Sequence, residues 1–199
     1  MSALYNFAST TVRVYSTVVW NARIYGRENV PRNGPLIVAC NHVSLLDPPV
    51  MGCFVPRQVS YMAKRELFEI PVLGPLIRGL GAYPVDRGGT ATAAIKRSVE
   101  VLRAGGCVGI FPEGGRNVEG DKAPRGGVAL LASLANAPVV PAAIVGTDEK
   151  KKRGKIKVAF GRPVALPADR KATRDELAKF TDTVMSAIYA LARDIGGNS

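Results

Sequence analysis

Residues 38–49, which read VACNHVSLLDPP, contain the side chains of this chain that are best suited to proton transfer. His42 is the only histidine, and Asp47 follows it after four intervening residues. An imidazole with its ordinary pKa of about 6.5 can accept a proton from a hydroxyl near neutral pH. A carboxylate bound to one ring nitrogen fixes the tautomer and leaves the other nitrogen available as a base. His42 and Asp47 are therefore candidates for a general base and the residue that orients it.

Asp47 also has a purely structural interpretation. Pro48 and Pro49 follow it, and proline is favoured at the first position of a helix. Aspartate is a common N-cap residue, because its carboxylate accepts hydrogen bonds from the first N–H groups of a helix. We expect Asp47 to be the N-cap of a helix, a position that is compatible with a contact to the imidazole of His42.

Ser44 and Cys40 lie close to His42 and raise the alternative of a nucleophilic serine or thiol. Ser44 lacks the G-x-S-x-G surroundings of a nucleophile elbow, and Cys40 ends a buried strand and alternates away from His42. The cysteines, which also include Cys53 and Cys107, form no CxxC pair, and one histidine cannot complete a zinc site of the usual spacing. We expect all of them to be buried, reduced thiols.

The rest of the chain alternates between strand and helix patterns, which predicts how these residues are positioned. Apolar runs typical of strands cover residues 35–40, 58–64, 82–87, 107–114, 138–146 and 155–161. A helical apolar pattern ends at Gly105, and a capping box at Thr173–Glu176 begins the last helix. The alternation predicts an α/β fold: a single domain with a mostly parallel, mixed sheet flanked by helices.

Polar side chains follow three of the predicted strands. His42, the pair Asp86 and Arg87, and Glu113–Arg116 each lie at the end of a different strand. The carboxyl ends of parallel strands meet at one edge of a sheet, where open α/β sheets bind ligands. Glycine N–H groups and arginine guanidinium groups both suit an anion such as phosphate. Singly, each arginine could be a surface cation and Glu113 a salt-bridge partner. A base, an acid and two arginines at one edge of the sheet are harder to explain as surface residues and raise the possibility of a functional site.

The formal net charge of +11, from 27 Lys and Arg against 16 Asp and Glu, indicates an anionic partner. Nucleic acid fits poorly, because the basic residues are scattered and the aromatic residues do not alternate with them. An acidic membrane surface or a phosphorylated substrate fits better. We expect the basic run Lys150–Lys155 to be a solvated hairpin loop or, as a second interpretation, a contact for anionic headgroups.

The N-terminal segment, residues 1–25, is expected to be helical and to precede an α/β domain at residues 26–199. The residues with roughly the spacing of one helical face are Leu4, Phe7, Val12, Tyr15 and Val19. The segment contains no uninterrupted apolar run long enough to span a bilayer, and it lacks the features of a secretory signal. Its residues alone allow two interpretations: a helix packed on the domain, or an interfacial helix with Tyr and Trp at headgroup depth.

Five blocks of the sequence, in order, resemble the glycerolipid acyltransferases of the lysophosphatidate acyltransferase (PlsC) type. They are Asn41–Asp47 (NHxSxxD), Ala63–Leu67 (AKxEL), Gly81–Arg87 (GxxxxxR), Phe111–Arg116 (FPEGTR) and Val140–Ile144 (VPVAI). The resemblance extends from about residue 35 to 145. Gly115 departs from it, because the family usually has Thr or Ser there, and Arg125 stands where many members have Lys.

The resemblance implies an O-acyltransferase of phospholipid biosynthesis. It would move a fatty acyl group from acyl-CoA or acyl carrier protein to the free hydroxyl of lysophosphatidate, giving phosphatidate. His42 would be the general base and Asp47 would orient it, with no acyl-enzyme intermediate, no metal and no cofactor. The residues implied to bind the substrate are Lys64, Arg87, Glu113, Gly114, Gly115 and Arg116. Among them the cationic residues would hold the phosphate, and Glu113 would contact the glycerol.

The resemblance also favours the interfacial interpretation of the N-terminal segment. It implies a peripheral membrane protein at the cytoplasmic face of the cell membrane, whose partners are a lysophospholipid, the acyl donor and an anionic membrane surface, without nucleic acid. Two alternatives stay open. The acceptor could be glycerol 3-phosphate or another lysolipid, or the chain could be a basic membrane-binding or lipid-binding protein that has no catalytic activity.

Overall fold

A computed structural model describes residues 2–85, 92–117, 124, 126–148, 155–167 and 172–196. Within these ranges the strands form one sheet in the order β1-β7-β6-β2-β5-β3-β4. The strands are β1 (Arg23–Tyr25), β2 (Leu36–Cys40), β3 (Val59–Lys64), β4 (Tyr83–Val85), β5 (Cys107–Ile110), β6 (Val139–Val145) and β7 (Lys157–Phe160). Only the pairing of β6 with β7 is antiparallel among those described, so the predicted mostly parallel, mixed sheet is confirmed.

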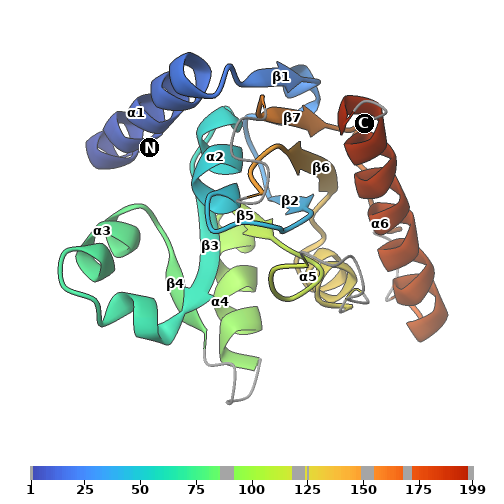
Figure 1. Ribbon diagram of the computed structural model, residues 1–199. Helices are drawn as coiled ribbons and strands as arrows, with labels where there is room; N and C mark the ends of the chain where they lie inside the picture. Colours follow the sequence, from blue (N-terminus) through green and yellow to red (C-terminus); the bar gives the residue numbers. More distant parts are fainter. Residues whose placement is uncertain are drawn as a thin grey trace.

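Helices cover both faces of this sheet (Figure 1). The helices are α1 (Ala3–Val19), α2 (Asp47–Phe54), α3 (Leu73–Gly79), α4 (Thr92–Arg103), α5 (Gly127–Ala135) and α6 (Arg174–Gly196), with short 3-10 turns η1 (Arg27–Asn29) and η2 (Arg65–Phe68). Helices α1 and α2 lie on one side of the sheet, and α4, α5 and α6 lie on the other. The chain therefore forms the predicted α/β architecture of a sheet between helical layers.

The central strand β2 is buried along its whole length because both of its faces are covered. Leu36, Val38 and Cys40 pack in the cluster that contains α2, whereas Ile37 and Ala39 pack in the cluster that contains α5 and α6. This alternation explains why residues 35–40 read as a continuous apolar run. It also fixes the end of β2, and hence the backbone before His42, between two packed layers.

Two local sequence signals are confirmed at helix ends. Gly105 has a φ of +76° just after α4, a conformation that favours glycine and that stops the helix. Before α6, the Thr173 N–H donates to Glu176 Oε2 at 2.8 Å, and the Glu176 N–H donates to Thr173 Oγ1 at 3.3 Å. These contacts are the reciprocal hydrogen bonds of a capping box.

The N-terminal segment differs from the prediction in two respects. Its helix ends at Val19, and Arg23–Tyr25 form β1, an edge strand parallel to β7. The helical prediction through residue 25 is wrong there, because Asn21 turns the chain with a φ of +46° and β1 gains its hydrogen bonds from a distant strand. The predicted face is also wrong at Val12, which packs against the core while the other members point outward.

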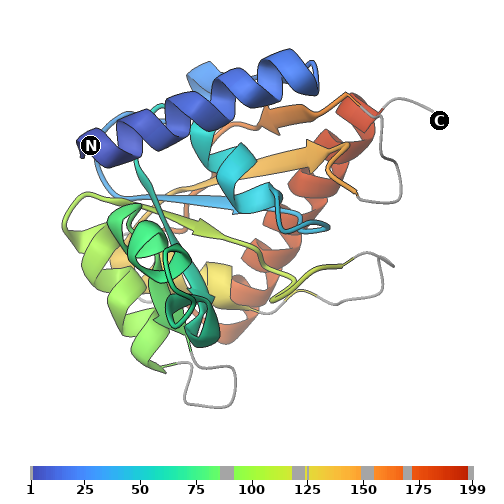
Figure 2. The same ribbon diagram turned by 60° about the vertical axis from the view of Figure 1, so that its left-hand side comes forward.

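Helix α1 combines a packed side and an exposed apolar side. The Tyr5 hydroxyl accepts a hydrogen bond from the Val59 N–H at 3.1 Å, and Ser16 is fully buried. The exposed side includes Phe7 and Val18, which expose 73% and 77% of their surface. Figure 2 shows α1 lying lengthwise across the outside of the domain. Within the described residues, no helix is both long and apolar enough to cross a membrane.

Candidate active site

His42, in the loop that connects β2 to α2, lies in contact with Asp47, the first residue of α2. The Nδ1 atom of His42 is 2.9 Å from Oδ2 of Asp47. The Asp47 side chain is fully buried, whereas 13% of the His42 side chain is exposed. Because an ionised carboxylate can only accept, Nδ1 carries the proton and donates a hydrogen bond to Oδ2 of Asp47. Nε2 is then the basic nitrogen, so the predicted pair has the geometry of an oriented general base.

The carboxylate of Asp47 also binds the loop that precedes it. Its Oδ2 atom accepts hydrogen bonds from the N–H groups of Val43 at 2.7 Å and Ser44 at 2.8 Å. The prediction that Asp47 is an N-cap is wrong, because the N-cap of α2 is Leu46 and Asp47 is the first helical residue. The Asp47 side chain turns back to the loop N–H groups, and this places it against the imidazole.

Glu113, from the loop after β5, holds the backbone of His42. Its Oε2 atom accepts a hydrogen bond from the His42 N–H at 2.9 Å, and the Asn117 N–H donates to the His42 carbonyl at 2.6 Å. Glu113 is 95% buried, and its Oε1 atom accepts from Asn117 Nδ2 and the Tyr189 hydroxyl. The structure thus brings Glu113 to the site, where it binds the protein itself, and the glycerol contact stays a prediction.

Aromatic packing supports the imidazole from a neighbouring strand. The Phe111 ring stacks on the His42 ring with the centroids 4.2 Å apart, and Tyr61 of β3 lies 6.1 Å from Phe111. Gly109 leaves the room that Tyr61 occupies, since a Cβ there would come within 2.2 Å of the Tyr61 ring. This packing restricts rotation of the imidazole, so that Nε2 keeps one direction.

The predicted substrate-binding residues are placed less completely. Lys64 is the exposed last residue of β3, and Arg116 is exposed three positions after Glu113. Gly114 has a φ of +69°, and its N–H donates to the Phe111 carbonyl at 2.9 Å within the turn. Gly115 follows it and is partly exposed. Their roles in substrate binding stay predictions.

Three parts of the sequence with predicted roles or resemblances lie outside the described residues. Asp86 and Arg87 follow β4, which ends at Val85 on the same edge of the sheet as β2, β3 and β5. Residues 150–154 of the basic run lie in the connection between β6 and β7, and that connection joins an antiparallel pair, as predicted for a hairpin. Arg125 also lies outside the described ranges.

The nearby serine and cysteine are poorly placed to act as nucleophiles. Ser44 is 98% buried, and its hydroxyl accepts a hydrogen bond from the Leu46 N–H at 3.2 Å. Cys40 is fully buried, and burial raises the pKa of its thiol well above the ordinary value. Cys53 and Cys107 are buried as well. The prediction of buried thiols is confirmed, and the geometry favours direct action of His42 as a base.

Sequence reasoning did not identify three residues that complete this group. Thr147 donates to Asp47 Oδ1 at 2.6 Å, and Asn117 and Tyr189 donate to Glu113. Burial, followed by the charge of Glu113, raises the pKa of Tyr189, so its hydroxyl stays protonated and can donate at neutral pH. Asn117 follows Arg116 directly and was within reach of the motif, but nothing in the local sequence signals Thr147 or Tyr189.

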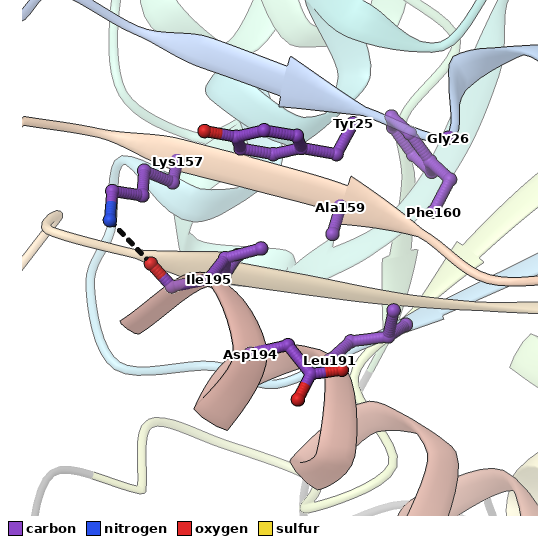
Figure 3. A pocket seen from close by; sticks show the side chains of 8 residues that line it. All are labelled: Tyr25, Gly26, Lys157, Ala159, Phe160, Leu191, Asp194 and Ile195. Atoms are coloured by element: carbon purple, nitrogen blue, oxygen red, sulfur yellow. Dashed lines mark hydrogen bonds between the residues drawn. The ribbon is translucent and has the colours of Figure 1, made fainter. Parts of the chain in front are cut away.

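A pocket lies away from the residues around His42. It has a volume of about 440 Å³ and is lined by Tyr25, Lys157, Phe160 and residues of the last turns of α6 (Figure 3). Strand β6 separates β7 from β2, so this pocket does not belong to the site around His42. Within the described ranges, no three His, Cys, Asp or Glu side chains are grouped as a metal site requires, and the expectation of no metal stays a prediction.

Comparisons with known proteins show what this chain is similar to. The family model named Acyltransferase matches residues 21–145. The chain is 33% identical to the 1-acyl-sn-glycerol-3-phosphate acyltransferase of Bacillus subtilis over 94% of this chain and 96% of that protein. It is 32% identical to the enzyme of the same name from Streptococcus pneumoniae, over 78% of this chain and 60% of that protein. The crystal structure of the 1-acyl-sn-glycerophosphate (LPA) acyltransferase, PlsC, from Thermotoga maritima matches with a TM-score of 0.74 at 25% identity, covering 95% of this chain and 82% of that chain.

Proposed function

The chain belongs to the acyltransferase family, and on that premise we propose that it transfers a fatty acyl group from a thioester to the free hydroxyl of lysophosphatidate. The product would be phosphatidate, a precursor of phospholipids. The observation that carries this proposal is the 2.9 Å contact between the imidazole of His42 and the buried carboxylate of Asp47. The names of the relatives from Bacillus subtilis and Streptococcus pneumoniae support the acceptor.

In the proposed reaction, His42 acts as the base for the acceptor hydroxyl. Nδ1–H is engaged by Asp47, so Nε2 takes the proton while the hydroxyl oxygen attacks the thioester carbonyl. The imidazolium that forms is stabilised by the negative charge of Asp47. When the tetrahedral intermediate collapses, the carbon–sulfur bond breaks and the thiol of CoA or of the carrier protein leaves with the proton from Nε2. Every proton is then returned, and no acyl-enzyme forms.

A test of this proposal measures the products formed by the purified full-length chain. Acyl-CoA and acylated acyl carrier protein are each offered as the donor. The acceptors are lysophosphatidate, glycerol 3-phosphate and a lysolipid without a terminal phosphate. We expect phosphatidate from lysophosphatidate as the main product in mass spectrometry. A main product from another acceptor would overturn the proposed substrate, and no acyl transfer at all would favour the alternative of a lipid-binding protein.

The same assay tests the phosphate subsite through Arg116, which is exposed and lies between Glu113 and Asn117, the two residues that hold the backbone of His42. A guanidinium that binds phosphate contributes a charge-assisted contact worth roughly 1.5–3 kcal/mol, so Arg116→Gln should raise KM for lysophosphatidate by about tenfold to hundredfold. The KM for an acceptor without a terminal phosphate should change little. Arg174, exposed at the start of α6, offers a control as Arg174→Gln. An equal rise for both acceptors would contradict a phosphate contact.

We also propose that α1 attaches the protein to an anionic membrane surface on the cytoplasmic side, where the +11 charge would favour binding. The exposed side of α1 supports this, because Phe7 and Val18 have no packing role within the described part of the domain. These side chains can enter a membrane surface while α1 stays packed on the domain, because the opposite contact, between Tyr5 and β3, is not disturbed.

The double change Phe7→Ser and Val18→Ser should weaken binding to phosphatidylglycerol vesicles by at least about tenfold, since burying one large apolar side chain contributes about 1.5–3 kcal/mol. Co-sedimentation with vesicles of defined composition measures this. Leu134→Ser on α5, which removes an apolar side chain exposed by 44%, is the matched control. If the double variant binds as wild type does, the exposed side of α1 is not the attachment site.

A further inference from the structure

Thr147, just after β6, contacts Asp47, which binds the imidazole of His42. It lies two residues after β6, exposes only 4% of its surface, and contacts a residue 100 positions earlier in the chain. Its Oγ1 atom is 2.6 Å from Asp47 Oδ1. An ionised carboxylate accepts only, so the threonine hydroxyl donates. The contact is a short, buried, charge-assisted hydrogen bond, a class that is roughly twice as strong as one between neutral groups.

The two oxygens of Asp47 have different partners. Oδ2 accepts from the N–H groups of Val43 and Ser44 and from Nδ1 of His42. Within the described part of the chain, Oδ1 has only the hydroxyl of Thr147 as a hydrogen-bond partner. Removing this hydroxyl would leave a buried carboxylate oxygen unsatisfied, which is unfavourable for the ionised form. It would also remove a contact that holds the carboxylate through its second oxygen.

Two further contacts, from β6 itself, hold the start of the loop between β2 and α2. The Asn41 side chain donates from Nδ2 to the Ile144 carbonyl and accepts at Oδ1 from the Ile144 N–H, both at 2.9 Å. The loop between β2 and α2 is therefore held just before His42 by β6, and at its other end through Asp47, the first residue of α2, by Thr147 after β6. The block at residues 140–144 had no assigned role, and the contacts of Ile144 with Asn41 provide one, because they hold the start of this loop.

We propose that Thr147 is a positioning residue, whose hydroxyl holds the Asp47 carboxylate so that Oδ2 faces Nδ1 of His42. It would act through Asp47 without touching the substrate. The inference rests on the proposed function for its kinetic consequence, because only a reaction that uses Nε2 as a base depends on the orientation of the imidazole. Its structural part, the state of the His42 ring, can be tested without any substrate.

The kinetic test compares Thr147→Val, which keeps the shape and removes the hydroxyl, with Thr147→Ser, which keeps the hydroxyl. For Thr147→Val we expect kcat to fall by about tenfold to hundredfold, the equivalent of one lost hydrogen bond to a charged group, with KM for both substrates within about twofold. Thr147→Ser should keep most of the wild-type kcat. Thr181→Val is the matched control, because it removes another buried threonine hydroxyl, one that donates to the Leu177 carbonyl within α6.

The substrate-free test uses the fact that the chain has one histidine, so nitrogen-15 NMR of labelled protein without an affinity tag reports His42 alone. We expect a protonated Nδ1 with slow exchange in wild type and Thr147→Ser, and a broadened or lost Nδ1 proton signal in Thr147→Val. Identical signals in Thr147→Val and wild type would overturn the proposal, as would equal loss of kcat in the Val and Ser variants. If Thr147→Val does not fold, the wild-type spectrum alone still tests the proposal. A His42 ring protonated mainly at Nε2 would refute the proposal, because Nδ1 would then donate no hydrogen bond to Asp47. A wild type without acyl transfer would refute the proposed function and leave this test intact.

Discussion

Replacing His42 with alanine should lower kcat for acyl transfer by roughly a hundredfold to ten-thousandfold, the range that a positioned general base contributes. The physical reason is that the acceptor hydroxyl would have to lose its proton to water during the attack. No other imidazole exists in the chain to replace it. The measurement is the initial rate of phosphatidate formation at saturating donor and acceptor, with KM expected to change little.

The His42→Ala variant should remain folded, because the backbone contacts of this residue to the segment after β5 do not depend on its side chain. Its N–H donates to Glu113 and its carbonyl accepts from Asn117, and both contacts survive loss of the side chain. A thermal unfolding midpoint close to that of wild type is the control. Added imidazole should restore part of the rate, since a free base can enter the vacated space beside Phe111. Wild-type activity in a folded His42→Ala protein would exclude the mechanism.

Asp47→Asn should lower kcat by about a hundredfold or more while the protein stays folded, because a neutral amide cannot stabilise the imidazolium that forms during the reaction. The asparagine oxygen can still accept from the N–H groups of Val43 and Ser44, and its NH₂ group can donate to Thr147, whose hydroxyl is able to rotate. The rate of acyl transfer and the thermal midpoint are measured together. A wild-type kcat in this variant would show that the charge of Asp47 has no part in catalysis.

Asp47→Ala provides the contrast, because it leaves every donor around the carboxylate without its acceptor. Each buried donor that loses its partner costs roughly 1–3 kcal/mol, so we expect the free energy of unfolding to fall by several kcal/mol. Asp47→Asn and Asp47→Ala should therefore differ strongly in stability while both lose activity. If both variants lose only stability and keep kcat, Asp47 is a structural residue of the loop.

Patterns confined to a few neighbouring residues were sufficient for most of the fold. The apolar run at 35–40 predicts a buried strand, because burial on two faces requires apolar residues at every position. The capping box at Thr173–Glu176 predicts the start of α6, because reciprocal capping requires these two residue types three positions apart. Strand β1 left no such signature, because three residues are too few for a period and its hydrogen bonds come from β7.

In the site, too, local sequence predicted some features and contacts between distant segments determined the others. The sequence by itself determined the pair of His42 and Asp47, because four residues between them allow the chain to fold one side chain onto the other. Only the tertiary structure decided how Asp47 is used: its carboxylate turns back toward the loop, as the donors of Val43, Ser44 and the distant Thr147 require. A contact across 100 residues depends on how β6 lies beside β2, and no local spacing encodes that neighbourhood.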